Sequence, residues 1–107
     1  MVNQSTINAN QSAGVLIVNP STLTNQGLLE ASAGGTMQPS STISNAAGMI
    51  EANGSTSSMQ FLNGTSIQGG TLTTTNSGVL GVAASQTITL DGTTHGVLTN
   101  SGTYRCV

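Results

Sequence analysis

The side chains best suited to acid–base or metal chemistry in this 107-residue chain are three carboxylates, Glu30, Glu51 and Asp91. Glu30 and Glu51 lie near the ends of two similar stretches, STLTNQGLLEA at 21–31 and STISNAAGMIEA at 41–52. Carboxylates in equivalent places of adjacent repeats could hold a cation or act as the pair of a glycoside hydrolase. Each glutamate, however, stands between two apolar residues, and strand alternation then turns it toward solvent. We therefore predict surface charges at both positions.

A repeated phrase contains the third carboxylate and the only histidine. LNGTSI returns 28 positions later as LDGTTH. Asp91 takes the place of Asn63, which favours a turn residue over an acid, and His95 takes the place of Ile67, which favours the end of the regular repeat. Cys106 is the only cysteine, and no cysteine or carboxylate recurs at triad or metal-shell spacing with the histidine. We expect no catalytic residue, no cofactor and no metal site.

The composition excludes two classes of partner. Only 4% of the residues are charged, and Arg105 is the only basic one, which leaves no patch for phosphates or anionic lipids. The longest apolar run, 15–18, is far shorter than the roughly 18 residues of a membrane span. We therefore predict neither nucleic-acid binding nor membrane insertion. The opening MVNQSTINAN lacks the charged and apolar regions of a secretory leader, so an exported protein would carry its leader elsewhere.

Similar stretches recur along the chain. The two units that contain Glu30 and Glu51 are offset by 20 to 21 residues, and GMIEANGS at 48–55 matches GVLGVAAS at 78–85 with an offset of 30. The second match makes Gly81 the successor of Glu51. Internal similarity at periods of about 20 to 50 residues is typical of solenoids, propellers and arrays.

The spacing within each unit indicates strands. Apolar residues alternate with polar ones in short clusters, no segment has a helical stripe with caps, and the clusters are separated by turn-forming dipeptides: Gly34-Gly35, Asn53-Gly54, Asn63-Gly64, Gly69-Gly70 and Asp91-Gly92. We predict an all-β fold, a parallel β-solenoid of about five coils that residues 1–107 form as one segment. Asn-Gly turns also suit the hairpins of an antiparallel β-sandwich, which is the alternative. The matched units run in the same chain direction, which favours the solenoid.

The solenoid prediction assigns Phe61 and the aliphatic residues at alternate strand positions to the interior. The predicted inward residues are Ile7, Ile17, Leu23, Leu29, Ile43, Ile50, Phe61, Ile67, Leu72, Leu80, Val82, Ile88, Leu90 and Leu98. A coil needs a neighbour on each side to bury its apolar face, and neither end of the chain has an obvious polar cap. We expect open coil ends, adjoining repeats or self-association at those ends, and a longer parent protein.

Units such as LTNQGLLEASAGGTM, ISNAAGMIEANGST and LNGTSIQGGTLTTTNSGVLGV resemble repeats of large bacterial surface proteins. The resemblance is to the Asn-, Gly- and Thr-rich repeats of autotransporter passengers and filamentous-haemagglutinin-like adhesins, and it covers nearly the whole chain. It implies a right-handed parallel β-helix on the cell exterior that serves as a stalk or an adhesive surface. It implies no catalytic residue.

We therefore expect a structural or adhesive, non-enzymatic segment whose partner is a host glycan or a matrix protein. Because arginine and aromatic anchors are scarce, adhesion should be weak per coil and depend on valency. One alternative is a carbohydrate-acting β-helix of the polysaccharide lyase or tailspike kind, which needs convergent carboxylates or basic groups. Another is ice binding, suggested by Thr-x-Thr at 71–73 and 87–89. Ice binding requires threonine rows on every coil, and Leu29 and Met49 occupy corresponding places.

Overall fold

The computed structural model describes residues 1–82 and 85–106, which form fifteen strands and no helix. All twelve strand pairings among these residues are parallel. The predicted parallel β-solenoid is thereby confirmed. The antiparallel β-sandwich, which would need antiparallel ladders, is excluded.

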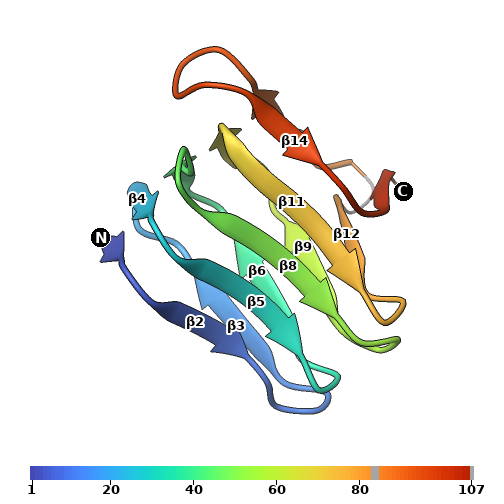
Figure 1. Cartoon of the computed structure of the whole chain (residues 1–107). Coiled ribbons are helices and arrows are strands. Elements are labelled where there is room, and N and C mark those ends of the chain that lie inside the picture. The colour runs from blue at the N-terminus through green and yellow to red at the C-terminus, as the bar shows by residue number, and fades with distance from the viewer. Residues whose placement is uncertain (83–84, 107) are drawn as a thin grey trace.

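The strands are arranged in five coils of three. Coil 1 contains β1 (Val2–Asn3), β2 (Thr6–Ala9) and β3 (Val15–Val18); coil 2 contains β4 (Thr22–Asn25), β5 (Leu28–Ser32) and β6 (Thr36–Pro39); coil 3 contains β7 (Thr42–Ser44), β8 (Met49–Asn53) and β9 (Ser58–Phe61); coil 4 contains β10 (Ser66–Gln68), β11 (Gly70–Thr75) and β12 (Val79–Val82); coil 5 contains β13 (Thr89–Asp91), β14 (Leu98–Asn100) and β15 (Tyr104–Cys106). The coils lie side by side from the blue N-terminal end to the red C-terminal end (Figure 1).

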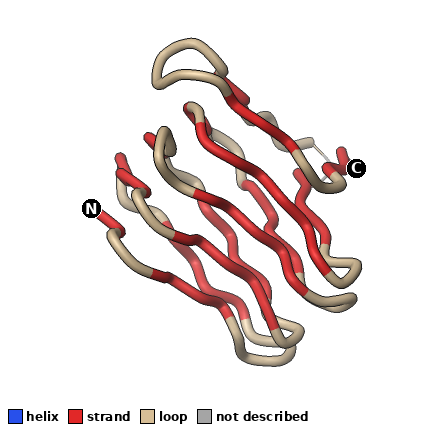
Figure 2. The backbone as a smooth tube through the Cα atoms, viewed as in Figure 1, coloured by secondary structure: helices blue, strands red, loops and turns tan. Residues whose placement is uncertain are grey.

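Stacking of the coils produces three sheets of five strands each. Sheet A has the order β1-β4-β7-β10-β13, sheet B has the order β2-β5-β8-β11-β14, and sheet C has the order β3-β6-β9-β12-β15. Successive turns of the tube repeat the same strand–loop sequence (Figure 2). Each strand therefore pairs with the strand one coil before it and the strand one coil after it, and only coils 1 and 5 have an open side.

The predicted turn dipeptides all lie where one strand gives way to the next. Gly34, Gly54 and Gly64 have positive φ angles, as do both residues of Gly69-Gly70. A positive φ costs glycine little because it has no Cβ. At Gly70 a Cβ would overlap the Asn45 carbonyl oxygen, so this corner of coil 4 accepts only glycine.

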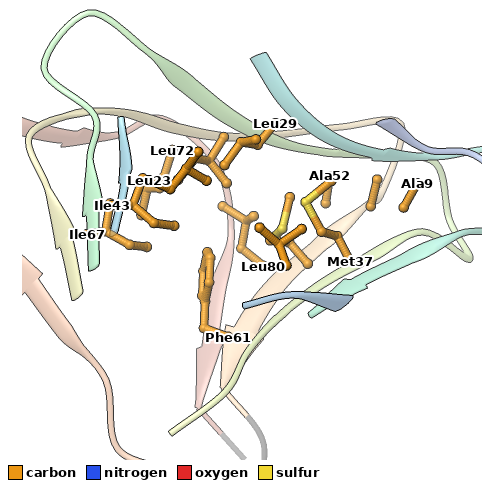
Figure 3. Close-up of a cluster of buried hydrophobic side chains, with 14 residues drawn as sticks. Ala9, Leu23, Leu29, Met37, Ile43, Ala52, Phe61, Ile67, Leu72 and Leu80 are labelled. Carbon is orange, nitrogen blue, oxygen red and sulfur yellow. The ribbon is translucent and has the colours of Figure 1, made fainter. Parts of the chain in front are cut away.

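The core consists of columns of side chains, one residue from each coil. Sheet A contributes Leu23, Ile43 and Ile67, sheet B contributes Leu29, Ile50 and Leu72, and sheet C contributes Met37, Met59 and Leu80. All nine side chains are fully buried, and they meet along the axis of the solenoid (Figure 3). Burial of a side chain of this size stabilises the fold by about 1.5–3 kcal/mol, so the columns are the main source of stability.

Most of the predicted interior is confirmed. Nine of the predicted residues are buried, and Ile7, Ile88 and Leu98 are partly buried against the core. Ile17 was assigned to the wrong face, because it is 59% exposed and pairs with Gln38. Leu90 continues the column of sheet A but is 43% exposed, because it lies in the last coil.

The error at Ile17 has a simple cause. The strand Val-Leu-Ile-Val is apolar at every position, so alternation does not define its inner face. The structure places Leu16 beside Met37 and buries Val18. The interior residues Met37 and Met59 were missed because no aliphatic alternation marks the strands that contain them.

Two of the sequence alignments are wrong in register. Met49 pairs with Thr71, not with Val79, so the successor of Glu51 is Thr73 rather than Gly81. Ile67, the last residue of LNGTSI, pairs with Leu90, the first residue of LDGTTH. LNGTSI therefore leads into a strand of sheet A, whereas LDGTTH leads out of the next strand of that sheet. Most paired residues lie 20 to 24 positions apart, as Thr22, Thr42 and Ser66 do, and longer offsets arise from loops.

A ladder of buried asparagines runs along the corner between sheets A and B. The Asn3 amide donates to Asn25 Oδ1 and the Asn25 amide donates to Asn45 Oδ1, both at 2.8 Å. The Asn45 amide donates to the Gly69 carbonyl at 3.2 Å, where the ladder ends. The Asn3 amide also donates to the Leu28 carbonyl in coil 2, and the Asn25 amide donates to the Met49 carbonyl in coil 3. Because buried polar groups need partners, the ladder fixes both the register and the corner.

Asn25→Ala is expected to lower the free energy of unfolding by about 2–4 kcal/mol, because it leaves buried donors and acceptors of two neighbouring coils without partners. Urea-induced unfolding measures the change. Asn3→Ala is the matched control, since it removes only the first member of the ladder, and should cost about 1 kcal/mol. Equal losses in the two variants would contradict a cooperative ladder.

Candidate functional site

Glu30 and Glu51 are stacked on the outer face of sheet B. They are paired residues of β5 and β8, as predicted, and both are half-buried between inward neighbours. The row continues as Asn8 in coil 1 and Thr73 in coil 4. Like charges on directly opposed residues are destabilising, and the chain limits this arrangement to one pair.

Each glutamate accepts a hydrogen bond from the following coil. Asn53 Nδ2 donates to Glu30 Oε2 at 3.3 Å, and the Thr75 hydroxyl donates to Glu51 Oε2 at 2.7 Å. Asn53 in turn accepts from Asn76 at 2.9 Å. The carboxylates therefore take part in a surface network that joins coils 2, 3 and 4.

Asp91 closes the turn after β13, as its sequence position predicted. Its carboxylate accepts hydrogen bonds from the backbone amides of Thr93 and Thr94, at 2.8 and 3.0 Å, and from both threonine hydroxyls. The hydroxyl of Thr94, followed by the amides and then the hydroxyl of Thr93, lowers the pKa of Asp91 below its usual range. A carboxylate held in this way stabilises the turn as the anion.

His95 lies in the exposed loop between β13 and β14. Its Nδ1 is hydrogen-bonded to Gln68 Oε1 at 2.9 Å. Leu98 lies 28 positions after its partner Gly70, so this loop is longer than the equivalent loops of other coils. His95 is exposed, as expected, but the prediction that the regular repeat ends there is wrong, because β14 and β15 follow it and pair with β11 and β12. Its equivalence to Ile67 is also wrong, since Ile67 pairs with Leu90.

The three carboxylates do not surround one groove. Asp91 is on sheet A of coil 5, whereas Glu51 is on sheet B of coil 3, a separation of two coils or about 10 Å along the axis alone. Within residues 1–82 and 85–106, no three His, Cys, Asp or Glu side chains gather into a metal-binding group. The geometry thus offers one stacked pair and one turn residue.

Sheet A presents rows of hydroxyls that sequence reasoning missed. One outer row is Thr22, Thr42, Ser66 and Thr89, and the neighbouring row is Thr24, Ser44, Gln68 and Asp91. By strand geometry, members of a row are about 4.8 Å apart and the two rows about 6.6 Å apart. The signal was present as a recurring triplet of hydroxyl, aliphatic and polar residue, at 22–24, 42–44, 66–68 and 89–91.

Among the described strands, sheet A is the one whose outer hydroxyls follow each other over four coils, whereas Thr36 and Ser58 of sheet C are flanked by Val15 and Val79. On sheet B, the outer side chains of the glutamate network are hydrogen-bonded, and the Ser32 hydroxyl donates to Asn8 Oδ1. On sheet C, the Gln38 amide donates to Gln60 Oε1 at 3.0 Å. Within the described part of the chain, no side-chain hydrogen bond involves the hydroxyls of Thr22, Thr24, Thr42, Ser44, Ser66 or Thr89. Their donors and acceptors are available to a partner.

The threonines first associated with ice binding do not form one row. Thr71 belongs to sheet B, where its row continues as Met49 and Leu28, so the predicted interruption is confirmed with Leu28 in place of Leu29. Thr89, by contrast, belongs to the continuous row of sheet A.

Two hollows lie near the ends of the solenoid. One is lined by residues 8–11 and 14–16 of coil 1. The other is lined by Val82, Ile88, Leu90 and Tyr104, with Gln86 and Thr87. No carboxylate, histidine or basic side chain lines either hollow, and the phenol of Tyr104 is the ionisable group among the lining residues.

No family model, no curated protein and no solved structure matches this chain. In the described ranges there is no helix long and apolar enough to cross a membrane. Function is therefore inferred from the geometry of the chain's own surfaces.

Asp91→Ala is expected to unfold at a lower urea concentration than the unchanged chain at pH 7. The folded pKa lies below the unfolded value of about 3.9, so the carboxylate's contribution is fully present above that pH and is lost as the pH falls. The difference between the two proteins should therefore shrink between about pH 4 and about pH 2. A difference that stays constant over this range would mean that the charge of Asp91 does not hold the turn.

Proposed function

We propose that the chain is a non-catalytic structural and adhesive segment of a secreted or cell-surface bacterial repeat protein, related in design to autotransporter passengers and filamentous-haemagglutinin-like adhesins. The observation that carries the adhesive part is the array of uncommitted hydroxyls on sheet A, held at regular spacing by a rigid stack of coils. The surface location rests on the resemblance of the repeats to those proteins.

A neutral glycan is the partner that this surface suits best. Hydroxyls both donate and accept hydrogen bonds, and the rows of sheet A contain a single charge, at Asp91. Binding hot spots are usually Trp, Tyr or Arg, and the outer rows of sheet A have none. Each contact is therefore weak, and useful adhesion needs many copies or a long rod. A matrix protein is the second partner to be tested.

The placement of the carboxylates supports a non-catalytic role. A glycoside hydrolase needs two carboxyl groups that flank the glycosidic bond it cleaves, about 5–9.5 Å apart. Both carboxyl groups must therefore face the groove that holds the sugar. Glu30 and Glu51 are close, but they occupy the outer face of sheet B and are engaged by Asn53 and Thr75.

Single chains, kept dilute enough to remain monomeric, are expected to show no measurable binding to an array of neutral oligosaccharides or to immobilised collagen and fibronectin. Four copies displayed on streptavidin should bind, because multivalency raises avidity by about 10²–10⁴. Thr42→Lys, in the middle of the sheet A row, should abolish this binding. Thr36→Lys is the matched control, since Thr36 is an equally half-buried outer threonine on sheet C.

Two results would overturn the proposal. Release of reducing ends or unsaturated sugars from a polysaccharide would indicate a carbohydrate-acting enzyme. Equal loss of binding in Thr42→Lys and Thr36→Lys would remove sheet A as the adhesive face.

A second candidate function, binding to ice, is favoured by one observation. The row Thr22, Thr42, Ser66 and Thr89 places a hydroxyl on four successive coils of one sheet. A periodic row of hydroxyls can meet a periodic surface of water molecules, whereas Gln68 and Asp91 interrupt the neighbouring row.

Ice binding predicts a lowered freezing point relative to the melting point and slower recrystallisation of ice. Thr42→Lys should remove both effects and Thr36→Lys should retain them, because only the first charge disturbs the row. Normal ice growth in the presence of the unchanged chain would remove this candidate and leave the adhesive proposal intact.

A further inference from the structure

Coils 1 and 5 each leave one side of three strands uncovered. The strands β1, β2 and β3 end one side of sheets A, B and C, and we call their exposed side the N-edge. The strands β13, β14 and β15 end the other side, which we call the C-edge. The two edges lie at opposite ends of the stack (Figure 1).

The backbone of the N-edge is directed outward at alternate residues. The carbonyls of Gly14 and Val18 accept hydrogen bonds from the amides of coil 2, both at 3.0 Å. Residues of a strand direct their backbone groups alternately to its two sides, so the N–H and C=O groups of Val15 and Ile17 point away from coil 2. An edge of this kind is a template for another strand.

The side chains of the N-edge do nothing to block such pairing. Val15 is 56% exposed, Leu16 37% and Ile17 59%. Proteins usually protect an edge strand with a charge, a proline or a bulge, whereas no residue before Glu30 has a charged side chain and β3 contains no proline. The β3 part of the N-edge is therefore apolar and open, and the charge beside the N-edge is the ammonium group of Met1, which donates to the Thr22 carbonyl on sheet A.

The contacts inside the chain indicate what covers such an edge. One inward column of sheet C runs from Leu16 through Met37, Met59 and Leu80 to Tyr104. The column starts with a partly exposed aliphatic side chain at the N-edge and ends with a half-buried ring at the C-edge, where Tyr104 also stacks on Phe61 at 6.3 Å between centroids. A coil 1 placed on the C-edge would continue the column with an apolar contact.

Sheet A gives the same result. Its column of Leu23, Ile43 and Ile67 ends in the exposed Leu90 of the C-edge. The asparagine ladder is no obstacle, because coils 3 and 4 already stack with Gly69 in place of an asparagine. The charges of the C-edge, Asp91 on sheet A and Arg105 on sheet C, would meet no like charge, because no residue of coil 1 has a charged side chain and the Met1 ammonium lies on the side of sheet A, opposite in sign to Asp91.

We infer that the N-edge binds the C-edge of a second copy of this chain, head to tail, so that sheets A, B and C continue from one molecule into the next. The inference rests on the proposed function as a structural rod, and it adds that the rod lengthens as further copies of the chain bind at its ends. Two N-edges facing each other would need antiparallel pairing, which no ladder of the described chain uses, so the contact joins unlike edges. Unlike edges produce an open filament rather than a closed dimer.

Proline substitutions at outward-directed backbone positions test each edge separately. Ile17→Pro removes an N–H of the N-edge, and Asn100→Pro removes one of the C-edge, since Ser101 directs its own amide to Leu72 at 2.8 Å. Proline is tolerated on an edge when its N–H would face solvent. Sedimentation velocity across a concentration series then gives the mass of each variant, and circular dichroism establishes its β content.

The unchanged chain should form species that grow in whole-chain steps, each variant alone should remain a monomer, and an equimolar mixture should form a one-to-one pair. Dimerisation of Asn100→Pro alone would overturn the inference in favour of paired N-edges, and dimerisation of Ile17→Pro alone in favour of paired C-edges. A folded unchanged chain that stays monomeric would overturn it and leave the proposed function standing. A disordered unchanged chain would count against both.

A pair of charge variants provides the matched control. Val15→Lys adds a charge at the N-edge, and Ser58→Lys adds the same charge to the same outer row of sheet C in the central coil. Association should require at least a tenfold higher concentration for Val15→Lys and be unchanged for Ser58→Lys. Equal effects of the two lysines would show that net charge, not the edge, controls association.

Discussion

The parallel, in-register pairing of each strand with its counterpart one coil away is the constraint on which the whole structure depends. It places Ile43 over Leu23, Asn25 over Asn3 and Glu51 over Glu30. Each side chain must therefore be compatible with a similar side chain on the neighbouring strand, about 4.8 Å away. Aliphatic groups gain from this repetition by packing, and amides gain because each is both donor and acceptor.

The same constraint accounts for the unusual composition. Charges stacked in a column repel, and the chain holds its charged residues to 4% and stacks carboxylates once, with hydrogen-bond donors from the next coil beside each. Serine, threonine and glutamine stack without repulsion and fill the outer rows instead. The low charge thus suits a fold that stacks like side chains in columns.

Sequence reasoning identified the fold because its signals are local. Alternation placed residues such as Leu23, Ile50 and Leu72 inside, and Gly-containing dipeptides marked the turns. It failed where information from another coil was needed. The offsets of 28 and 30 residues were taken from similar stretches of sequence. The residues that pair are determined instead by strand register, and loops of unequal length shift that register away from the similar stretches. The inner face of β3 depends on that register and could not be derived from local pattern alone. The hydroxyl row of sheet A had a local signal in its recurring triplets, but only the register shows that these triplets pair with one another.

The direction of the backbone hydrogen bonds has a mechanical consequence. In a solenoid they run along the stacking axis, and the two ends of the described chain lie at opposite ends of that axis (Figure 1). Tension applied between these ends peels strands off one after another instead of shearing a whole sheet at once. Each coil of about 20 to 24 residues releases some 70–80 Å of extended chain in place of its thickness of about 4.8 Å. The stack therefore yields one coil at a time at low force, and it lengthens under load before it fails.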